Sequence, residues 1–507
     1  MSWYFYVIAA YLLVLMGFNI YRSRKVKTQD DMMVAGRSLG YKVMVFTLIC
    51  TWIGSGTFIS GAEFAAKAGW SSLWLPAGAW AGIVVIYFLA AKIRTFGQYT
   101  IGDILEVRYG KFARIFGAIA IIISFVAIVS YQFKAGGFVL NIVSNGNMSV
   151  ETGQFLTFLF VTGFVALAGM MAVAYTDLPN GIIILVACVF ATPFVYFAAG
   201  GWEQAVATLP EQHFSVINKD FGHIPLLKFG AYFLATMLLL MGVQSMYQKF
   251  YSAKTPKDAK QGVALWIVGM VIVETVVIVM AIFAASKYWN TPDGIQTFIN
   301  SGGESGLNPA SLVLKAAKDL VPGYVGVLLL AAACVVVLST GMNYLLSPST
   351  NIMRDIYQRF ISPDASPKAM IILQKVTIII LGCIAYFLCT KLTSVLEMAF
   401  FAYTIYGVAI TPAVIAALGW KRATKSAGVA SITSGTVVAL SLYIYGFINP
   451  SIMLPAGSDN ADPWGIPIIY PALFVSLATL FIVSYMTKAP TDEELKALFP
   501  EKSQESV

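Results

Sequence analysis

The segment that decides the fold is "FTLICTWIGSGTFISGAEF", residues 46–64. It is apolar over most of its length, yet Gly54, Ser55 and Gly56 interrupt it near the middle. Each glycine weakens a helix by up to about 1 kcal/mol relative to alanine. In a membrane, irregular backbone is tolerated only where it is buried in protein or lines a cavity. The segment therefore predicts a transmembrane helix broken at a binding site, or one in which Gly54 and Gly61 admit a closely packed neighbour.

Apolar stretches of similar length fill the rest of the chain. Of its 507 residues, 58% are hydrophobic and only 11% are charged. Soluble globular proteins carry about 25% charged residues, so the composition excludes a soluble multidomain enzyme and a disordered chain. A membrane-spanning helix needs about 20 apolar residues. We expect an all-α polytopic membrane protein of about 13 transmembrane helices, at residues 3–21, 43–63, 70–93, 112–143, 153–175, 180–200, 227–249, 262–287, 322–346, 369–389, 394–419, 426–448 and 466–487.

Lysine and arginine set the expected orientation. Most of the 33 basic residues fall in alternate connecting segments, beginning with residues 22–42 after the first span. Cytoplasmic loops carry the excess of Lys and Arg, so we expect the N-terminus outside and a cytoplasmic tail at residues 488–507. The net charge of +8 then reports topology in a plasma membrane. It is not evidence for a nucleic-acid partner, and we expect none.

The sequence lacks the residues that several other function classes require. The two histidines, His213 and His223, fall in one expected outer loop without paired acids or a nucleophile at a plausible spacing. This argues against an enzyme. The sequence shows no ring of charged residues that would line a channel pore. It also carries no signal for an oligomeric state.

Two adjacent hydroxyls stand in the apolar segment "VLLLAAACVVVLSTGMNYLLSPSTNIMRDIY", residues 327–357. They belong to Ser339 and Thr340. Hard cations such as Na+ prefer oxygen ligands, which these hydroxyls and the carbonyls of a broken helix would supply. The alternative is that each hydroxyl bonds to a carbonyl of its own helix.

Three charged residues fall within or beside expected spans. Lys134 is either an anchor for an anion, or a structural residue held in an ion pair or by a buried hydrogen bond. Glu274 is either a proton or ion relay, or a protonated carboxyl that stands alone or bonds to a neighbouring hydroxyl. Asp177, placed at the cytoplasmic end of the span 153–175, is either a helix cap or a residue that guides an ion out.

Six motifs in order resemble those of the sodium/solute symporter family, which includes sodium-coupled sugar, proline, sialic acid, iodide and choline transporters. They are "DDMMVAGRSLG" (30–40), "TIGDILEVRYG" (100–110), "GMMAVAYTDLPNG" (169–181), "SMYQKFYSAKTPKDAKQG" (245–262), "LSTGMNYLLSPSTNIMRDIY" (338–357) and "PAVIAALGWKRATKSAG" (412–428). The resemblance implies a five-plus-five inverted repeat with broken first and sixth core helices. It places repeat one at 43–200 and repeat two at 227–419. An extra helix and loop (1–42) precede them, and two extra helices (420–487) follow.

The resemblance also implies a sodium site, with sodium as the coupling ion. Its ligands would be the carbonyls and hydroxyls of Cys50, Ile53, Val336, Ser339 and Thr340. Asp177 matches a family aspartate, which favours the ion-exit role. Pro179 and Asn180 depart from the family pattern after it, which speaks against substrate contact by this loop.

The expected solute cavity lies beside the broken helix. Its residues would be Trp52, Ser55, Thr57, Tyr131, Lys134, Tyr403 and Tyr406. Trp52 and Tyr131 suit a quaternary amine through cation–π attraction, whereas Lys134, one turn after Tyr131, favours a carboxylate. We therefore predict sodium-coupled symport of a small organic solute, with a carboxylate favoured, into the cell by alternating access. The alternatives are a proton-coupled symporter that uses Glu274, and a sodium-coupled transporter of a quaternary amine such as choline.

Overall fold

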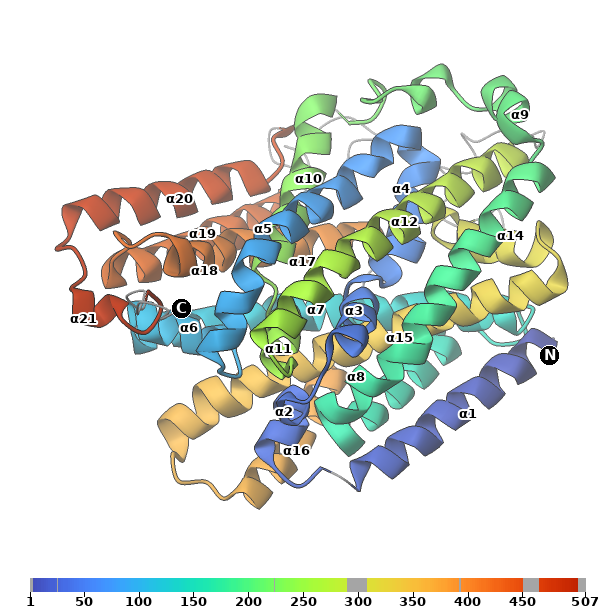
Figure 1. Cartoon of the computed structure of the whole chain (residues 1–507). Coiled ribbons are helices and arrows are strands. Elements are labelled where there is room, and N and C mark those ends of the chain that lie inside the picture. Colours follow the sequence, from blue (N-terminus) through green and yellow to red (C-terminus); the bar gives the residue numbers. More distant parts are fainter. Residues whose placement is uncertain are drawn as a thin grey trace, which may run out of the picture.

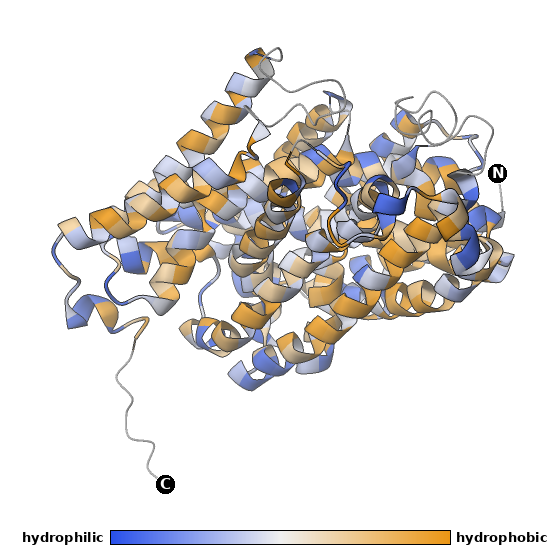
Figure 2. Ribbon diagram, turned by 90° about the horizontal axis from the view of Figure 1, so that it is seen from above, coloured by the Kyte–Doolittle hydropathy of each residue, from blue (hydrophilic) through white to orange (hydrophobic). Residues whose placement is uncertain are grey.

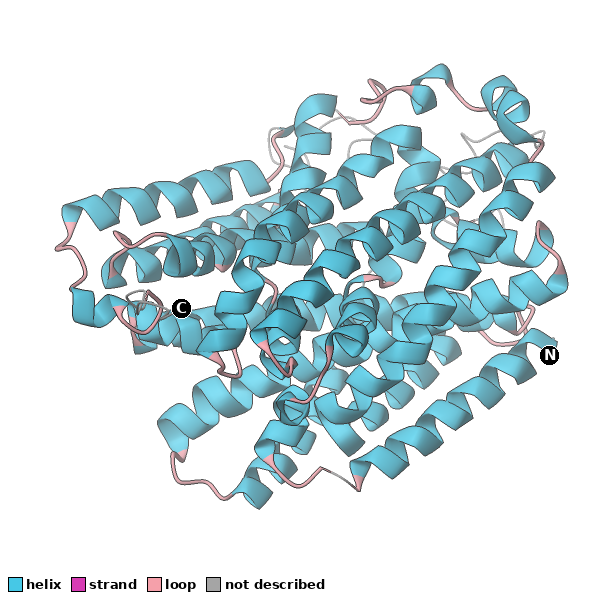
Figure 3. Ribbon diagram, in the orientation of Figure 1, coloured by secondary structure: helices cyan, strands magenta, loops and turns pink. Residues whose placement is uncertain are grey.

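The computed structural model describes residues 3–24, 26–222, 224–289, 308–391, 394–449 and 465–499 (Figure 1). The regular elements in these ranges are helices, which Figure 3 shows in cyan. Twelve helices in these ranges are long and apolar enough to cross a membrane. The expected all-α polytopic membrane fold is therefore confirmed. His223 and residues 500–507 of the expected tail lie outside the described residues.

The long helices follow the expected spans closely. They are α1 (Trp3–Ser23), α5 (Trp74–Phe96), α7 (Lys111–Val143), α8 (Val150–Ala198), α10 (Pro225–Gly242), α12 (Pro256–Trp289), α15 (Gly323–Asn351), α16 (Pro367–Lys391), α17 (Val395–Ala409), α19 (Lys425–Ile448) and α20 (Ile469–Met486). Shorter helices continue or connect them: α2 (Gln29–Val34), α6 (Ile101–Tyr109), α9 (Gly201–Thr208), α11 (Gln244–Ser252), α14 (Leu312–Asp319), α18 (Thr411–Gly419) and α21 (Asp492–Leu495).

The expected second span is broken as its sequence predicts. Helix α3 (Tyr41–Trp52) ends at Ile53, whose φ of −65° and ψ of 103° are extended. The chain becomes helical again in a π-helical turn, Gly56–Ser60, and continues as α4 (Gly61–Ala68). The first piece, α3, is too short to count among the twelve, and the second, residues 56–68, is counted together with α5 as Gly56–Phe96.

A second break lies in the first helix of the other expected repeat. Helices α10 and α11 meet at Val243, whose φ of −71° and ψ of 120° are also extended. Figure 1 shows that the two broken helices run in opposite directions, because α4 lies above α3 whereas α11 lies below α10. This is the arrangement that inverted repeats produce.

The helices of the expected repeats pack in two groups. Helix α5 packs against α10 and α12, and α12 also packs against α3. In the other group α15 packs against α7 and α8, and α16 packs against the same two helices. Helix α3 contacts both α8 and α15, so the break in α3 lies where the two groups meet. Small residues permit this packing: a Cβ at Gly78 of α5 would lie 2.0 Å from the carbonyl oxygen of Phe233 on α10.

The outer surface of the helices is apolar, as a lipid environment requires. Large hydrophobic side chains such as Leu13, Phe88, Phe197, Phe387 and Phe474 are more than half exposed. Figure 2 shows hydrophobic residues along the long helices. The chain is thus a multi-pass membrane protein.

One expected boundary is wrong. We expected spans at 153–175 and 180–200, with Asp177 at the end of the first. The structure instead turns at Gly169, whose φ is +53°, and the two candidate spans are Val150–Leu167 and Gly169–Ala198. A Cβ at Gly169 would lie 2.5 Å from Met32 Sδ, so glycine also lets α2 pack against the turn. Asp177 therefore lies inside the second span and does not cap a helix.

Candidate functional site

The two adjacent hydroxyls of α15 meet the broken end of α3. Thr340 Oγ1 lies 2.9 Å from the carbonyl oxygen of Ile53 and 3.0 Å from that of Cys50. Ser339 Oγ lies 3.2 Å from the same Cys50 oxygen. Both hydroxyls donate across to α3, so the alternative in which they bond to their own helix does not apply. Val336 is buried one turn before Thr340 on α15.

The unwound backbone after Trp52 and the absence of a side chain at Gly54 make the contact between α3 and α15 possible. After Trp52 the backbone becomes extended, which leaves the carbonyls of Cys50 and Ile53 open to a partner from another helix. A Cβ at Gly54 would lie 2.8 Å from Thr340 Cγ2, so a larger residue would push α15 away. The result is a cluster of neutral oxygens from hydroxyls and carbonyls, a donor set that suits a hard monovalent cation.

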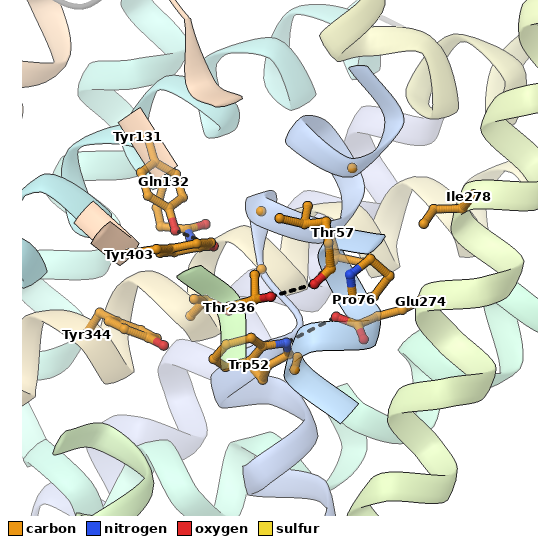
Figure 4. Close-up of a pocket in the computed structure, with 16 residues that line it drawn as sticks. Trp52, Thr57, Pro76, Tyr131, Gln132, Thr236, Glu274, Ile278, Tyr344 and Tyr403 are labelled. Atoms are coloured by element: carbon orange, nitrogen blue, oxygen red, sulfur yellow. Dashed lines mark hydrogen bonds between the residues drawn. The ribbon is translucent and has the colours of Figure 1, made fainter. Parts of the chain in front are cut away.

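A cavity of about 560 Å³, its opening included, lies beside this cluster (Figure 4). Its lining consists of Trp52, Gly54, Gly56, Thr57, Gly61, Leu75, Pro76, Ala79, Tyr131, Gln132, Thr236, Glu274, Ile278, Thr340, Tyr344 and Tyr403. Thr340 thus belongs both to the oxygen cluster and to the cavity wall. In Figure 4 the three tyrosines lie on one side of the cavity and Glu274 on the other.

Four of the seven expected cavity residues are in this lining: Trp52, Thr57, Tyr131 and Tyr403. The other three are not. Ser55 is buried in the unwound segment, and Lys134 lies on α7 outside the lining. The Tyr406 hydroxyl donates to the Gly242 carbonyl (2.7 Å) and accepts from the Gln244 backbone N–H (2.9 Å). Tyr406 therefore stabilises the break between α10 and α11.

The cavity also contains polar residues that we did not expect there. Gln132 is fully buried, and its Oε1 accepts the Ser55 backbone N–H at 3.1 Å. Glu274, which the sequence suggested as a relay but not as a cavity residue, accepts from two indoles. Trp52 Nε1 lies 3.1 Å from its Oε1, and Trp80 Nε1 lies 2.7 Å from its Oε2. The sequence signal for Glu274 was its charge, but nothing in the sequence indicated its partners.

Asp177 lies in a polar group beyond the hydroxyls. Its Oδ2 accepts from Thr47 Oγ1 at 2.6 Å and lies 3.4 Å from Asn343 Nδ2. Asn343 also donates to the Ser339 carbonyl at 2.9 Å. Lys249 Nζ lies 3.8 Å from the same Asp177 oxygen, and both side chains are fully buried. We had not predicted Lys249 in any site, although its motif was part of the family resemblance.

A separate charged cluster joins α6, α7 and the π-helical segment Ile352–Ile361 that follows α15. Arg114 lies 2.7 Å from Asp103 and from Asp355, and it also pairs with Glu106. Arg359 reaches Glu106 from the residues after α15. Burial acts to raise the pKa of Glu106, but Arg114 and Arg359 outweigh it and hold that pKa below its usual value. The cluster is distinct from the cavity, because none of these residues lines it.

Two oppositely directed broken helices, an oxygen cluster at one break and a cavity beside it define a secondary transporter of the inverted-repeat class. The comparisons with known proteins agree with this class. A model of the sodium:solute symporter family matches residues 32–435, and the chain belongs to this family. The family consists of transporters, so the chain is a transport protein and not an enzyme.

Relatives and solved structures cover nearly the whole chain. The high-affinity proline transporter PutP of Bacillus subtilis is 24% identical, over 94% of this chain and 97% of its own. The high-affinity choline transporter 1 of Drosophila melanogaster is 23% identical, over 95% of this chain and 78% of its own. The structure of a Na+-coupled sialic acid symporter in a substrate-bound outward-open state superimposes with a TM-score of 0.76 at 16% identity. That match covers 97% of this chain and 99% of the symporter.

Proposed function

We propose that the chain is a symporter that moves a small organic solute into the cell together with Na+. The observation that carries this proposal is the meeting of the Ser339 and Thr340 hydroxyls with the carbonyls of Cys50 and Ile53. Na+ would bind among these four oxygens and the carbonyl of Val336. The ion is a transported substrate, so the site has to form and open in each cycle.

The proposed mechanism is alternating access. Na+ entering from outside binds between α3 and α15, and this holds the two helix groups in the state that accepts solute. Coupling requires that Na+ and solute favour the same state. Na+ then leaves toward the cytoplasm past Asp177, which the Asn343 amide links to the backbone carbonyl of Ser339. A membrane potential adds about 2.3 kcal/mol per charge per 100 mV to this uptake. The topology that goes with it has the N-terminus outside and the C-terminus in the cytoplasm of a plasma-membrane protein.

The solute class follows from the relatives and the lining together. The names of the relatives specify proline, choline and sialic acid, all small organic solutes. Our expectation of a carboxylate depended on Lys134, which does not line the cavity. A carboxylate on the solute would instead meet Gln132, whose buried Nε2 has no hydrogen-bond partner among the residues that the structure describes. We propose a small solute that presents a hydrogen-bond acceptor to Gln132.

The test measures uptake of labelled proline, glycine betaine and choline into proteoliposomes reconstituted with the purified protein. Replacing external Na+ by K+ at constant pH abolishes uptake if Na+ drives transport. Uptake that persists in K+ and follows a pH gradient would refute sodium coupling. It would favour the proton-coupled alternative, for which the buried carboxyl of Glu274 is the specific observation.

A further inference from the structure

A carboxyl group faces the solute cavity. Glu274 of α12 is the one acidic residue among the lining residues, which include no lysine, arginine or histidine in the part of the chain that the structure describes. Its side chain is buried at 4% exposure. None of the ion pairs found among the described residues includes it. The two lysines noted above do not supply a partner in the lining, because Lys134 lies outside it and Lys249 pairs with Asp177.

The hydrogen bonds of Glu274 favour its ionised form. Each of its two oxygens accepts an indole N–H, one from Trp52 and one from Trp80. An indole N–H can only donate, and a carboxylate offers two equivalent acceptor oxygens, whereas a protonated carboxyl carries a hydrogen on one of them. Two charge-assisted bonds of this kind stabilise the carboxylate and fix its orientation.

An ionised carboxylate in such a place requires a cation. Without one, burial favours the neutral, protonated form, because two neutral indoles supply only part of what a buried charge needs. The carboxylate lies in the wall of the cavity, so a ligand in the cavity can reach it. A cationic group on the ligand would therefore supply the partner that lets Glu274 ionise.

The opposite wall suits a positively charged group as well. Tyr131, Tyr344 and Tyr403 lie across the cavity from Glu274, and Trp52 lies between the two sides in Figure 4. The Tyr131 and Tyr403 hydroxyls are 3.2 Å apart, which holds the two rings together. A cation over an aromatic ring gains about 0.5–2 kcal/mol, most when water is excluded.

We propose that the transported solute carries a cationic nitrogen and that Glu274, held by Trp52 and Trp80, is the carboxylate that binds it. This inference rests on the proposed symport function and names its substrate class. It replaces the anionic anchor that the sequence favoured at Lys134 by a cationic group at Glu274. The acceptor expected opposite the Gln132 amide then lies elsewhere on the same solute.

The experiment compares probes that differ only in the charge of one atom. Three pairs serve: L-proline with cyclopentanecarboxylate, glycine betaine with 3,3-dimethylbutanoate, and choline with 3,3-dimethylbutanol. Tetramethylammonium and methylammonium are added as bare cations. Binding is measured by thermal shift of the purified full-length protein in saturating Na+. We expect at least one cationic or zwitterionic probe to bind and its carbon isostere to bind at least tenfold more weakly.

Variants then test whether Glu274 causes the preference for a charged probe. Glu274→Gln is expected to weaken binding of the cationic probe at least tenfold and to leave the weak binding of its isostere unchanged. The matched control is Glu63→Gln, because Glu63 is also buried but already pairs with Lys67 at 2.8 Å. It should leave probe binding unaltered. Stabilisation by Na+ alone, measured in each variant, reports on folding and on the ion site independently of the solute.

Three outcomes would overturn the inference. One is a probe set in which neutral isosteres bind as well as their charged partners, or in which no cationic probe binds. Another is unchanged discrimination in Glu274→Gln when Na+ still stabilises that variant. The third is loss of Na+ stabilisation in Glu274→Gln with charge discrimination intact, which would make Glu274 an ion ligand. Failure of the symport proposal looks different, because Na+ would then stabilise neither the wild-type protein nor Glu274→Gln.

Discussion

Replacing Thr340 by valine tests the oxygen cluster with a small change. Valine keeps the branched shape but removes Oγ1, which contacts the carbonyls of Ile53 and Cys50 at 2.9 and 3.0 Å. The Cys50 oxygen retains Ser339 as a partner. The variant therefore removes one of the five proposed Na+ ligands and leaves the other four in place.

The expected loss of affinity is the difference between two interactions. A hydrogen-bonding group facing a charge contributes about 1.5–3 kcal/mol, whereas a neutral hydrogen bond contributes about 0.5–1.5 kcal/mol. The hydroxyl makes the first kind of contact with Na+ bound and the second kind without it. The net loss is about 1–1.5 kcal/mol, which raises the Na+ concentration for half-saturation about five- to twelvefold.

The measurement is binding of radioactive sodium to purified protein, with K+ keeping the ionic strength constant. Thr157→Val is the matched control, because Thr157 is a buried threonine of α8 whose hydroxyl bonds to its own helix at 2.8 Å from the Gly153 carbonyl. It should not change the half-saturation. A shift below about twofold in a well-folded Thr340→Val protein would refute the assignment, as would an equal shift in the control.

Two further predictions concern the neighbours of the cluster. Gly54→Ala would place a Cβ 2.8 Å from Thr340 Cγ2 and should weaken sodium binding several-fold. Gly163→Ala is the control, because its Cβ would meet nothing within 4 Å and sodium binding should not change. Equal sodium binding in the two variants would contradict this prediction. Lys249→Met removes the cation beside the buried carboxylate of Asp177 and should cost about 3–5 kcal/mol of stability, measured by unfolding in detergent. Adding Asp177→Asn should restore part of it, and no recovery would mean that the two residues do not act as a pair.

The sequence predicted the membrane fold because the requirement for about 20 apolar residues acts on each span separately. The break at Gly54 was also predictable, since a Gly-Ser-Gly run in an apolar helix is itself a local signal. The turn at Gly169 was not, because the apolar run "VALAGMMAVA" (165–174) continues through it. Only the +53° φ of Gly169 marks that turn, and backbone geometry is not visible in hydropathy.

The places of two residues around the cavity, Lys134 and Glu274, could not be predicted from the sequence. Lys134 follows Tyr131 by one turn and so shares its side of α7, but three residues also advance about 4.5 Å along the axis. This displacement is sufficient to separate a lining residue from one outside the lining. Glu274 became a cavity residue through partners on two other helices, Trp52 of α3 and Trp80 of α5. Such three-helix contacts depend on packing that no single segment encodes.

The break in α3 is where ion and solute can influence each other. Within six residues it offers the Cys50 and Ile53 carbonyls to α15, the Trp52 indole to Glu274 of α12, and the Ser55 N–H to Gln132 of α7. In the proposed symporter, an ion that draws α15 toward these carbonyls would fix the same backbone that positions Trp52 and Gln132 for the solute. Solute bound to Glu274 and Gln132 would in turn hold the carbonyls in place for the ion. Because such coupling is reciprocal, Thr340→Val should weaken solute binding measured in limiting Na+, and Glu274→Gln should abolish the gain in Na+ affinity that solute confers.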